Sequence, residues 1–219
     1  ELGRGADLPA PVAYRRFVAE ARLGLGDQAH RAFFRELLAD VDEPTAPFGL
    51  MDVQGEGRGI LEARRRLEPS IGLGVRAWAR RLGVSAASFV HLAWALALAR
   101  WTGRSDVVFG TVMFGRLRGE VGAEHVLGMF INTLPVRISV RGSEVSERLR
   151  QVHSSLAQLI RHEHAPLSLA QRCSGVPGHL PLFSTVLNYR HSSPSIVEAM
   201  PGVEVLWAEE RSNFPLTLS

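Results

Sequence analysis

The chain of 219 residues contains no lysine: each of its 25 basic side chains is arginine, against 22 acidic ones. The formal net charge is only +3, and acidic and basic residues alternate along most of the chain. Nucleic-acid-binding proteins need a basic surface that neutralises phosphates, so this balance argues against nucleic acid as a partner. We interpret the one dense basic cluster, Arg64-Arg65-Arg66, as a solvated run rather than a phosphate site.

Cysteine is also nearly absent, since Cys173 stands alone. A single cysteine excludes an intrachain disulfide and favours a reducing cytoplasm as the location. We expect its thiol to be a small buried or idle group rather than a nucleophile. No signal peptide precedes the first predicted helix, and no uninterrupted apolar run reaches the roughly 20 residues that span a bilayer, so we expect no membrane partner.

Motifs of hydrolytic and metal chemistry are missing as well. The sequence has no Gly-x-Ser-x-Gly elbow, and its eight histidines include no adjacent pair. His162 and His164 lie two apart at a predicted helix end, so we expect solvated histidines rather than a zinc pair. His91 is predicted to be a hydrogen-bonded core residue, and His191 and Ser192 lack an oriented acid nearby. The residues alone therefore predict no catalytic residue and no bound metal.

The clearest structural signal runs from Ser85 to Phe114. Ser85 can cap a helix, and residues 89–98 are almost all apolar, which is typical of a central helix. Residues 102–105 have the composition of a turn. Residues 106–114 are β-branched, aromatic and uncharged after the first position, as in a strand covered on both faces. Together they predict an α/β sandwich.

The same periodicities predict further elements. Residues 60–68 are compatible with either helix or strand before Pro69 ends the segment. Amphipathic helices are expected over residues 14–21, from Asp27 to about Val41, over residues 73–82 with Gly83 as the cap, and from a Ser143 cap to Ile160. Strands are expected from Thr133 and over residues 183–189, 203–207 and 216–218.

Several separated stretches together resemble the condensation domains of nonribosomal peptide synthetases. Residues 127–137, Leu-Gly-Met-Phe-Ile-Asn-Thr-Leu-Pro-Val-Arg, fit that family's Gly-x-Phe-(Val/Ile)-Asn-Thr-Leu-Pro-x-Arg motif nearly residue for residue. Residues 14–18 are similar to its Tyr-x-Asp-Phe element, with Arg16 in place of the acid. Residues 162–167 are similar to its His-Gln-Asp-x-Pro-Phe motif, and residues 212–216 to its Asn-x-Pro-Leu motif. The order is also that of the family, so the resemblance covers essentially the entire chain.

The resemblance implies an α/β fold, a chloramphenicol-acetyltransferase-like sandwich lobe with a mixed sheet and flanking helices. The family's His-His-x-x-x-Asp-Gly motif, whose second histidine lies at the condensation centre, does not occur in the chain. We therefore expect a piece of a two-lobed domain. Residues 1–48 are then the end of the N-terminal lobe and a connector. Residues 49–219 are the C-terminal lobe, incomplete at its C-terminus, and the missing N-terminal lobe is a partner.

The resemblance also implies what the parent domain does. Such domains form an amide bond between a donor acyl or peptidyl thioester and an acceptor aminoacyl thioester. Donor and acceptor carrier proteins deliver these substrates on phosphopantetheine arms, so both are expected partners and no cofactor is bound directly. This chain alone is expected to be inactive without the histidine motif. The alternative is a non-catalytic lobe that docks a carrier protein or acts as a scaffold. Within the family, residues 182–191 favour a dual epimerisation/condensation subtype.

Four residues receive roles in this way. For Arg116, which follows a predicted buried strand and a glycine, the residues alone leave a carboxylate partner and an exposed loop position equally open. The family offers the Asp of the absent motif as its partner, and we predict that this pair orders the active-site loop. Phe114, where many relatives carry a small Ser, is predicted to narrow the cleft and shape the acceptor pocket. Asn132 and Asn213 are predicted to support the site through structural hydrogen bonds rather than substrate contact.

Overall fold

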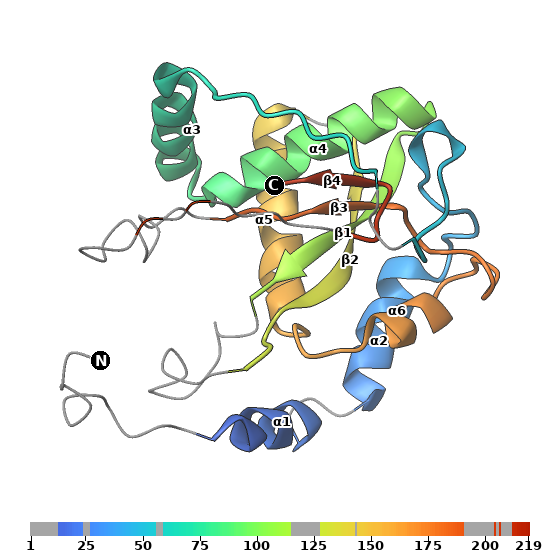
Figure 1. Ribbon diagram of the computed structural model, residues 1–219. Coiled ribbons are helices and arrows are strands. Elements are labelled where there is room, and N and C mark those ends of the chain that lie inside the picture. Colours follow the sequence, from blue (N-terminus) through green and yellow to red (C-terminus); the bar gives the residue numbers. More distant parts are fainter. Residues whose placement is uncertain are drawn as a thin grey trace, which may run out of the picture.

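A computed structural model describes residues 13–23, 27–55, 59–114, 128–142, 144–190, 204, 206 and 212–219. Within these ranges the chain forms helices that surround a four-stranded sheet (Figure 1). In chain order the elements are α1 (Tyr14–Leu23), α2 (Asp27–Leu38), the 3-10 turn η2 (Pro47–Gly49), α3 (Pro69–Leu82), α4 (Ala86–Thr102), β1 (Asp106–Met113), β2 (Asn132–Ser139), α5 (Val145–Ile160), α6 (Leu167–Arg172), β3 (Thr185–Leu187) and β4 (Leu216–Leu218).

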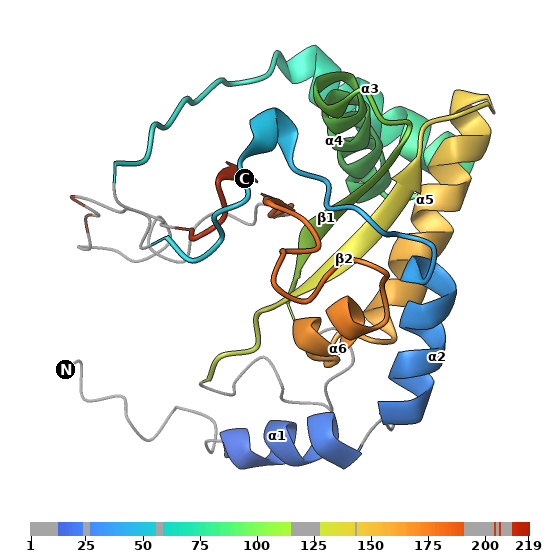
Figure 2. The same ribbon diagram turned by 90° about the vertical axis from the view of Figure 1, so that its right-hand side faces the viewer.

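The four described strands form one mixed sheet in the order β2-β1-β3-β4. β1 pairs antiparallel with β2, whereas β3 is parallel to both β1 and β4. Helices α4 and α5 pack against each other and against β1 and β2, and α6 contacts both β2 and α2 (Figure 2). The predicted α/β fold with a mixed sheet and flanking helices is therefore confirmed.

Helix α4 begins where the sequence predicts. The backbone N–H of Ser88 donates to the side-chain oxygen of Ser85 at 3.3 Å, so Ser85 is the N-cap. The helix ends at Gly103, whose φ of 69° is left-handed and suits glycine. Its buried side chains come from several sides of the helix, which explains the nearly unbroken apolar run.

Strand β1 is covered on both faces, as predicted, because residues 107–111 are all buried. Gly110 is required there by its neighbours. An added Cβ would lie 2.6 Å from Cε2 of Phe183 and 2.9 Å from Cγ2 of Val186. Gly110 faces Pro135 on β2, and β2 is an outer strand of the described sheet, where a residue without an N–H is tolerated.

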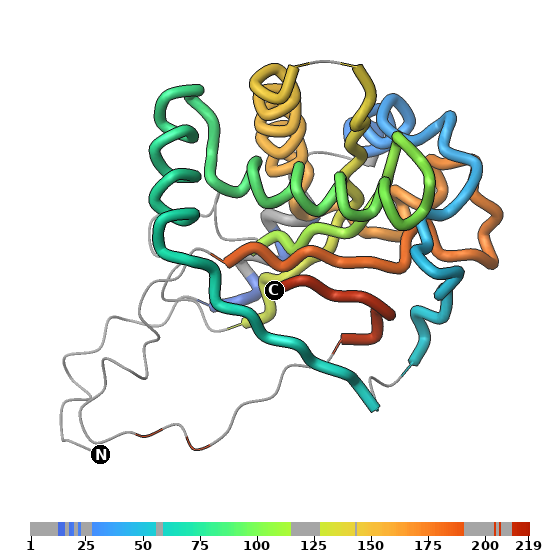
Figure 3. Tube along the Cα trace, turned by 90° about the horizontal axis from the view of Figure 1, so that it is seen from above, coloured from blue at the N-terminus to red at the C-terminus, as the bar shows by residue number. Residues whose placement is uncertain are grey.

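Helix α3 begins at Pro69, four residues before the predicted start. Pro69 was expected to end the preceding segment, but it occupies the first turn of the helix, where its missing N–H costs nothing. The helix closes at Gly83 with φ 67°, as predicted. Residues 60–68 form neither helix nor strand and run as an exposed, extended chain into α3 (Figure 3). The predicted solvated arginine run, residues 64–66, lies in this segment.

The later elements agree in part with the predictions. Helix α5 begins at Val145 with Glu144 as its N-cap, and the predicted cap Ser143 lies outside the described residues. Val145 itself is 62% exposed, whereas Leu149, Val152, Leu156 and Leu159 farther along this helix are buried. Strand β3 has only three residues of the predicted 183–189, because its pairing with β1 and β4 covers only these residues, and β4 matches its prediction. Residues 203–207 lie mostly outside the described part.

One hydrophobic core joins the helices to the sheet. Phe34 of α2 and Phe109 of β1 are both 0% exposed and belong to the same cluster. After α2, the side-chain oxygen of Thr45 accepts a hydrogen bond from the backbone N–H of Val108 at 2.9 Å. Helix α2 and the residues after it are thus packed onto the sheet. The assignment of residues 1–48 to another lobe stays a prediction.

Candidate functional site

The end of β1 and the start of β2 lie side by side at one end of the sheet. Met113, the last residue of β1, is paired with Asn132, the first residue of β2. Phe114 follows directly and is 52% exposed, and Ile131, which directly precedes β2, is 54% exposed. Apolar side chains therefore face the surroundings at this end. Arg116 lies outside the described residues, so its part in the site stays a prediction.

The side chain of Asn132 holds a distant turn against this end of the sheet. Its Nδ2 donates to the backbone oxygens of Glu163 and Ala165, both at 2.8 Å. Its Oδ1 accepts from the backbone N–H of Thr133 at 2.9 Å. Both amide N–H groups are used in backbone contacts, as a half-buried amide requires. Asn132 thus joins two stretches that resemble separate family motifs, residues 127–137 and residues 162–167. Support of an active site by Asn132 stays a prediction.

The prediction of a solvated His162 is wrong. Its ring stacks on Phe33 of α2 with centroids 4.1 Å apart and an interplanar angle of 10°. Its Nδ1 lies 2.9 Å from Nδ1 of His30, which is 5% exposed, so one nitrogen donates and the other accepts. Helical spacing carries no information on the packing of α2 over this turn, so sequence reasoning missed the contact.

His91 is a hydrogen-bonded core residue, as predicted. Its Nδ1 lies 2.8 Å from the backbone oxygen of Ala87, and its Nε2 lies 2.8 Å from Oγ1 of Thr111. A carbonyl only accepts, so Nδ1 carries the proton of the neutral ring and Nε2 accepts from the hydroxyl. Burial lowers the pKa of His91, and the hydrogen bond to Ala87 opposes this only in part. His191 and Ser192 lie outside the described residues.

Asn213 does not join Phe114 and Asn132. It precedes β4, which is parallel to β3 and β1, so it lies toward the opposite end of the sheet from Phe114. Asn213 is exposed, and its Nδ2 donates to the backbone oxygen of Val53 at 2.6 Å. The bond ties the start of β4 to the segment after η2. The predicted site residues that the structure describes thus form two groups, at opposite ends of the sheet.

Sequence reasoning assigned no role to Arg137, the last residue of the Asn-Thr-Leu-Pro-x-Arg motif. Its guanidinium contacts the carboxylates of both Asp40 and Asp106 and donates to the backbone oxygen of Leu37 at 2.9 Å. The hydrogen bonds from Arg137 lower the pKa of Asp40 to about 2, and those to Asp40 and Asp106 raise the pKa of Arg137. The sequence showed only that an arginine ends the motif, and it gave no indication of the carboxylates with which this arginine pairs.

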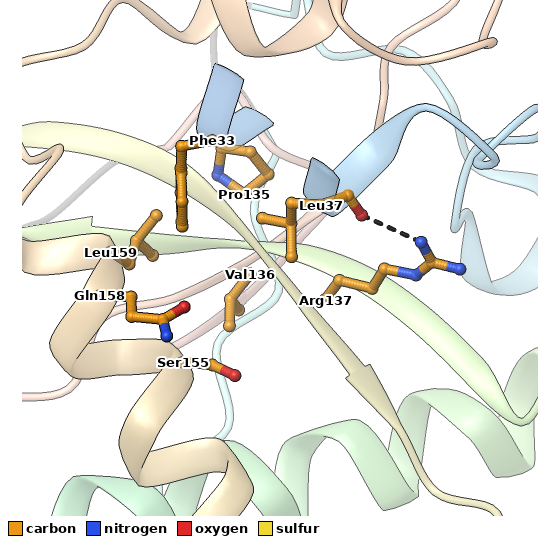
Figure 4. A pocket seen from close by; sticks show the side chains of 8 residues that line it. All are labelled: Phe33, Leu37, Pro135, Val136, Arg137, Ser155, Gln158 and Leu159. Carbon is orange, nitrogen blue, oxygen red and sulfur yellow. Dashed lines mark hydrogen bonds between the residues drawn. The ribbon is translucent and has the colours of Figure 1, made fainter. Parts of the chain in front are cut away.

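A small half-open pocket lies between α2, β2 and α5 (Figure 4). Figure 4 shows the hydrogen bond from Arg137 to the oxygen of Leu37 at one side of it. Neither Phe114 nor Asn132 contributes to its wall. The pocket is therefore separate from the end of the sheet described above. Its lining residues are Phe33, Leu37, Pro135, Val136, Arg137, Ser155, Gln158 and Leu159.

The described residues contain no group of three or more His, Cys, Asp or Glu side chains placed to hold a metal ion. Cys173 is buried, as predicted, and its thiol lies 3.8 Å from the backbone oxygen of Arg31. Among the described helices, none by itself is long and apolar enough to cross a membrane. The pair α3 and α4, bent by 110°, meets that length and composition only when taken together.

The comparisons with known proteins agree with one another. A model of the condensation domain family matches residues 2–219. Malpinin synthetase of Mortierella alpina is 48% identical over 220 residues, which are 99% of this chain and 3% of that protein. Malpibaldin synthetase of the same organism is 48% identical over 99% of this chain and 4% of its own length. A linear gramicidin synthase protein of Brevibacillus parabrevis is 30% identical over 99% of this chain and 4% of its own length. The chain thus spans only a few per cent of these synthetases.

The fold also has solved counterparts. A structure of the first condensation domain of the calcium-dependent antibiotic synthetase, in complex with a substrate analogue, superposes with a TM-score of 0.61 at 25% identity. The match covers 82% of this chain and 40% of that one. The resemblance found in the motifs and the predicted α/β fold are both confirmed. The chain belongs to the condensation domain family.

Proposed function

We propose that this chain is part of a nonribosomal peptide synthetase condensation domain that forms an amide bond between two carrier-bound substrates. The match of the family model over residues 2–219 carries the proposal. It is supported by the similarity to malpinin synthetase and a linear gramicidin synthase protein, and by the end of the sheet where Phe114 and Asn132 lie close together. Residues 1–48 are assigned to the end of an N-terminal lobe and residues 49–219 to the C-terminal lobe.

The proposed chemistry is transfer of an acyl group from sulfur to nitrogen. The acceptor amine attacks the carbonyl carbon of the donor thioester, the C–N bond forms and the C–S bond breaks. The amine proton is removed, and the donor thiol is released in its protonated form. An imidazole that titrates near neutral pH suits the removal or positioning of this proton. The family's His-His motif supplies that imidazole from the N-terminal lobe, so the 219 residues alone are expected to be inactive.

This chain's own residues are proposed to shape and support the site. Phe114, exposed beyond β1, forms a wall of the acceptor pocket. Asn132 holds the turn at residues 163–165 in place through its two amide hydrogen bonds. Arg116 pairs with the Asp of the histidine motif and orders the loop after β1. Asn213 supports the start of β4, at the other end of the sheet, by its bond to Val53.

The partners follow from the same proposal. Donor and acceptor carrier proteins present their substrates on phosphopantetheine arms, and the reaction takes place in the cytoplasm. No cofactor is held by this chain in the proposed reaction. A dual epimerisation/condensation subtype would convert a donor that ends in an L-residue to a D-residue in the product. Chiral analysis of the dipeptide decides between this subtype and plain condensation.

The decisive experiment is a reconstitution. The chain is combined with an N-terminal lobe that carries the His-His motif and is supplied with a loaded donor and a loaded acceptor carrier protein. We expect dipeptidyl carrier protein, detected by mass spectrometry, only when both lobes are present. Product from the chain alone would show that the histidine motif is not needed. Binding of a carrier protein without product from both lobes would favour the alternative, a docking or scaffold lobe.

Two substitutions in the combined protein test the proposed site residues. Arg116→Ala is expected to lower turnover sharply, and unchanged turnover and stability would refute its pairing role. Phe114→Ser is expected to widen the acceptor pocket, so larger acceptor side chains should be accepted at the expense of small ones. An acceptor profile identical to that of the parent protein would remove Phe114 from the pocket.

A further inference from the structure

Tyr14 is the first residue of α1, a helix that lies apart from the sheet below α2 in Figure 2. Its described contacts reach far along the chain, since its hydroxyl donates to the backbone oxygen of Met129, 115 residues later. The segment that it contacts, residues 128–130, leads directly into β2. Tyr14 therefore links two parts of the sequence that resemble two different family motifs.

Three consecutive residues of this segment touch Tyr14. The phenol ring lies edge-on to Phe130, with centroids 5.3 Å apart and an interplanar angle of 81°. The same ring covers Gly128, where an added Cβ would lie 2.5 Å from Cε2 and 2.7 Å from Cγ of Tyr14. The hydroxyl holds Met129 between them through its carbonyl. Only glycine lets the backbone lie this close to the ring.

This contact fixes how the chain enters β2. Phe130 is 5% exposed, whereas its neighbours Met129 and Ile131 are 72% and 54% exposed. Side chains two apart in an extended chain point to the same face, so the orientation of Phe130 also governs that of Asn132. Asn132 in turn holds the turn at residues 163–165. A change in backbone orientation at residues 128–130 would therefore also change the orientation of Asn132 in the proposed site.

We propose that Tyr14 is a positioning residue of the condensation site, which holds Gly128 to Phe130 and thereby orients Ile131 and Asn132 beside Phe114. The proposal rests on the proposed function and names a residue that acts on that site from α1. Tyr14 does not touch substrate on this view. It acts through the backbone of the Gly-x-Phe-x-Asn segment. The glycine of that segment, Gly128, leaves room for the Tyr14 ring because it has no side chain.

A double-mutant cycle tests this contact directly. Gly128→Ala places a methyl group against the ring, so it should speed hydrogen exchange of the amides at residues 129–133 by roughly tenfold or more. In a Tyr14→Ala background the methyl group has room, and the further effect of Gly128→Ala should be less than about twofold. Gly74→Ala is the control, because an added Cβ at Gly74 meets nothing within 4 Å.

Catalysis is measured on the same variants in the combined two-lobed protein. Tyr14→Phe keeps the ring and loses the hydroxyl, so it should retain most activity, whereas Tyr14→Ala should raise the KM for the acceptor by roughly tenfold and lower kcat less. A merely structural role of Tyr14 would lower the thermal midpoint of unfolding without this split between KM and kcat.

The outcomes separate two failures. If Gly128→Ala is equally damaging with and without the Tyr14 ring, the contact does not hold the segment and the inference is overturned. If the cycle shows coupling but Tyr14→Ala leaves KM unchanged, the contact is structural only and the positioning role is overturned. If the unmodified two-lobed protein makes no amide bond, the proposed function fails and the positioning role fails with it. The coupling between Tyr14 and Gly128 measured by hydrogen exchange would then still show that the two residues are in contact.

Discussion

Arg137 and Asp40 form a two-point ion pair, with Nη1 2.5 Å from Oδ1 and Nη2 2.8 Å from Oδ2. Two parallel N–H to oxygen bonds are the strongest geometry open to an arginine and a carboxylate. Asp40 lies just after α2 and Arg137 lies on β2, so the pair joins a helix to the sheet. The backbone oxygen of Leu37 accepts from the same guanidinium, which fixes the end of α2.

This pair predicts a loss of stability in acid. The pKa of Asp40 falls from 3.8 to about 2 because Arg137 donates to its carboxylate, so the unfolded chain binds more protons between these values. The stabilisation is complete above about pH 3.8 and is lost as the pH falls toward 2. Urea unfolding of the parent chain and Asp40→Asn from pH 5 to pH 2 checks this. Asp42→Asn removes a nearby carboxylate but leaves the pair of Arg137 and Asp40 in place, so it is the control. An equal slope in Asp40→Asn would contradict the prediction.

His91 predicts a second, milder pH dependence. Its folded pKa is lower than the ordinary value of 6.5 because the ring is buried, so the unfolded chain takes up its proton first as the pH falls. The free energy of unfolding should therefore decrease as the pH drops below about 6.5. His91→Gln removes the titrating group. Its unfolding free energy, measured between pH 8 and pH 5, should change less than that of the parent chain, and an identical profile would refute the assignment.

Gly110→Ala should destabilise the fold by about 1–3 kcal/mol, because the new methyl group meets Phe183, Thr133 and Val186 at 2.6–2.9 Å. These neighbours belong to the core or flank it, so they cannot move away freely. Gly74→Ala in α3 is the matched control, since nothing lies within 4 Å of the added carbon. It should be neutral or stabilising by up to about 1 kcal/mol. Chemical denaturation of both variants gives the comparison, and similar losses would show that packing around Gly110 does not matter.

Asn132→Asp should lower stability by about 1–3 kcal/mol, because the isosteric carboxylate cannot donate to the oxygens of Glu163 and Ala165. Those oxygens would then face a negative charge. Asn213→Asp removes a single bond at an exposed position and should cost less than about 1 kcal/mol. Thermal and urea unfolding test the ranking. A larger loss at Asn213 would show that Asn132 does not hold the turn.

Elements with local signals were predictable from the sequence. The Ser85 cap, the apolar run of α4 and the left-handed Gly103 all act within a few residues, so the helix is found where its sequence places it. The residues of β1 also suffice to predict a strand buried on both faces. By contrast, Pro69 marks the start of α3 and not the end of the segment before it, because proline is compatible with both positions.

Contacts between distant segments were not predictable. His162 stacks on Phe33 of α2, although its place at the end of α5 suggested a solvated ring. Arg137 meets Asp40 nearly a hundred residues away in the chain. No periodicity or motif spacing contains these pairings, since they depend on how α2 lies across the sheet. The motif arginine was visible in the sequence, but its partners were not.

The order and spacing of short motifs were enough to identify the family, and local capping and apolar patterns were enough to find most helices and strands. Which of those motifs meet depended on the folded chain. Because β2 runs antiparallel to β1, Phe114 and Asn132 share one end of the sheet. Because β3 and β4 run parallel to β1, Asn213 lies toward the other end. The direction and order of strands arise from pairing between segments far apart in the sequence. The contact of the Tyr14 ring with Gly128 also joins distant segments, so only the tertiary structure decided it.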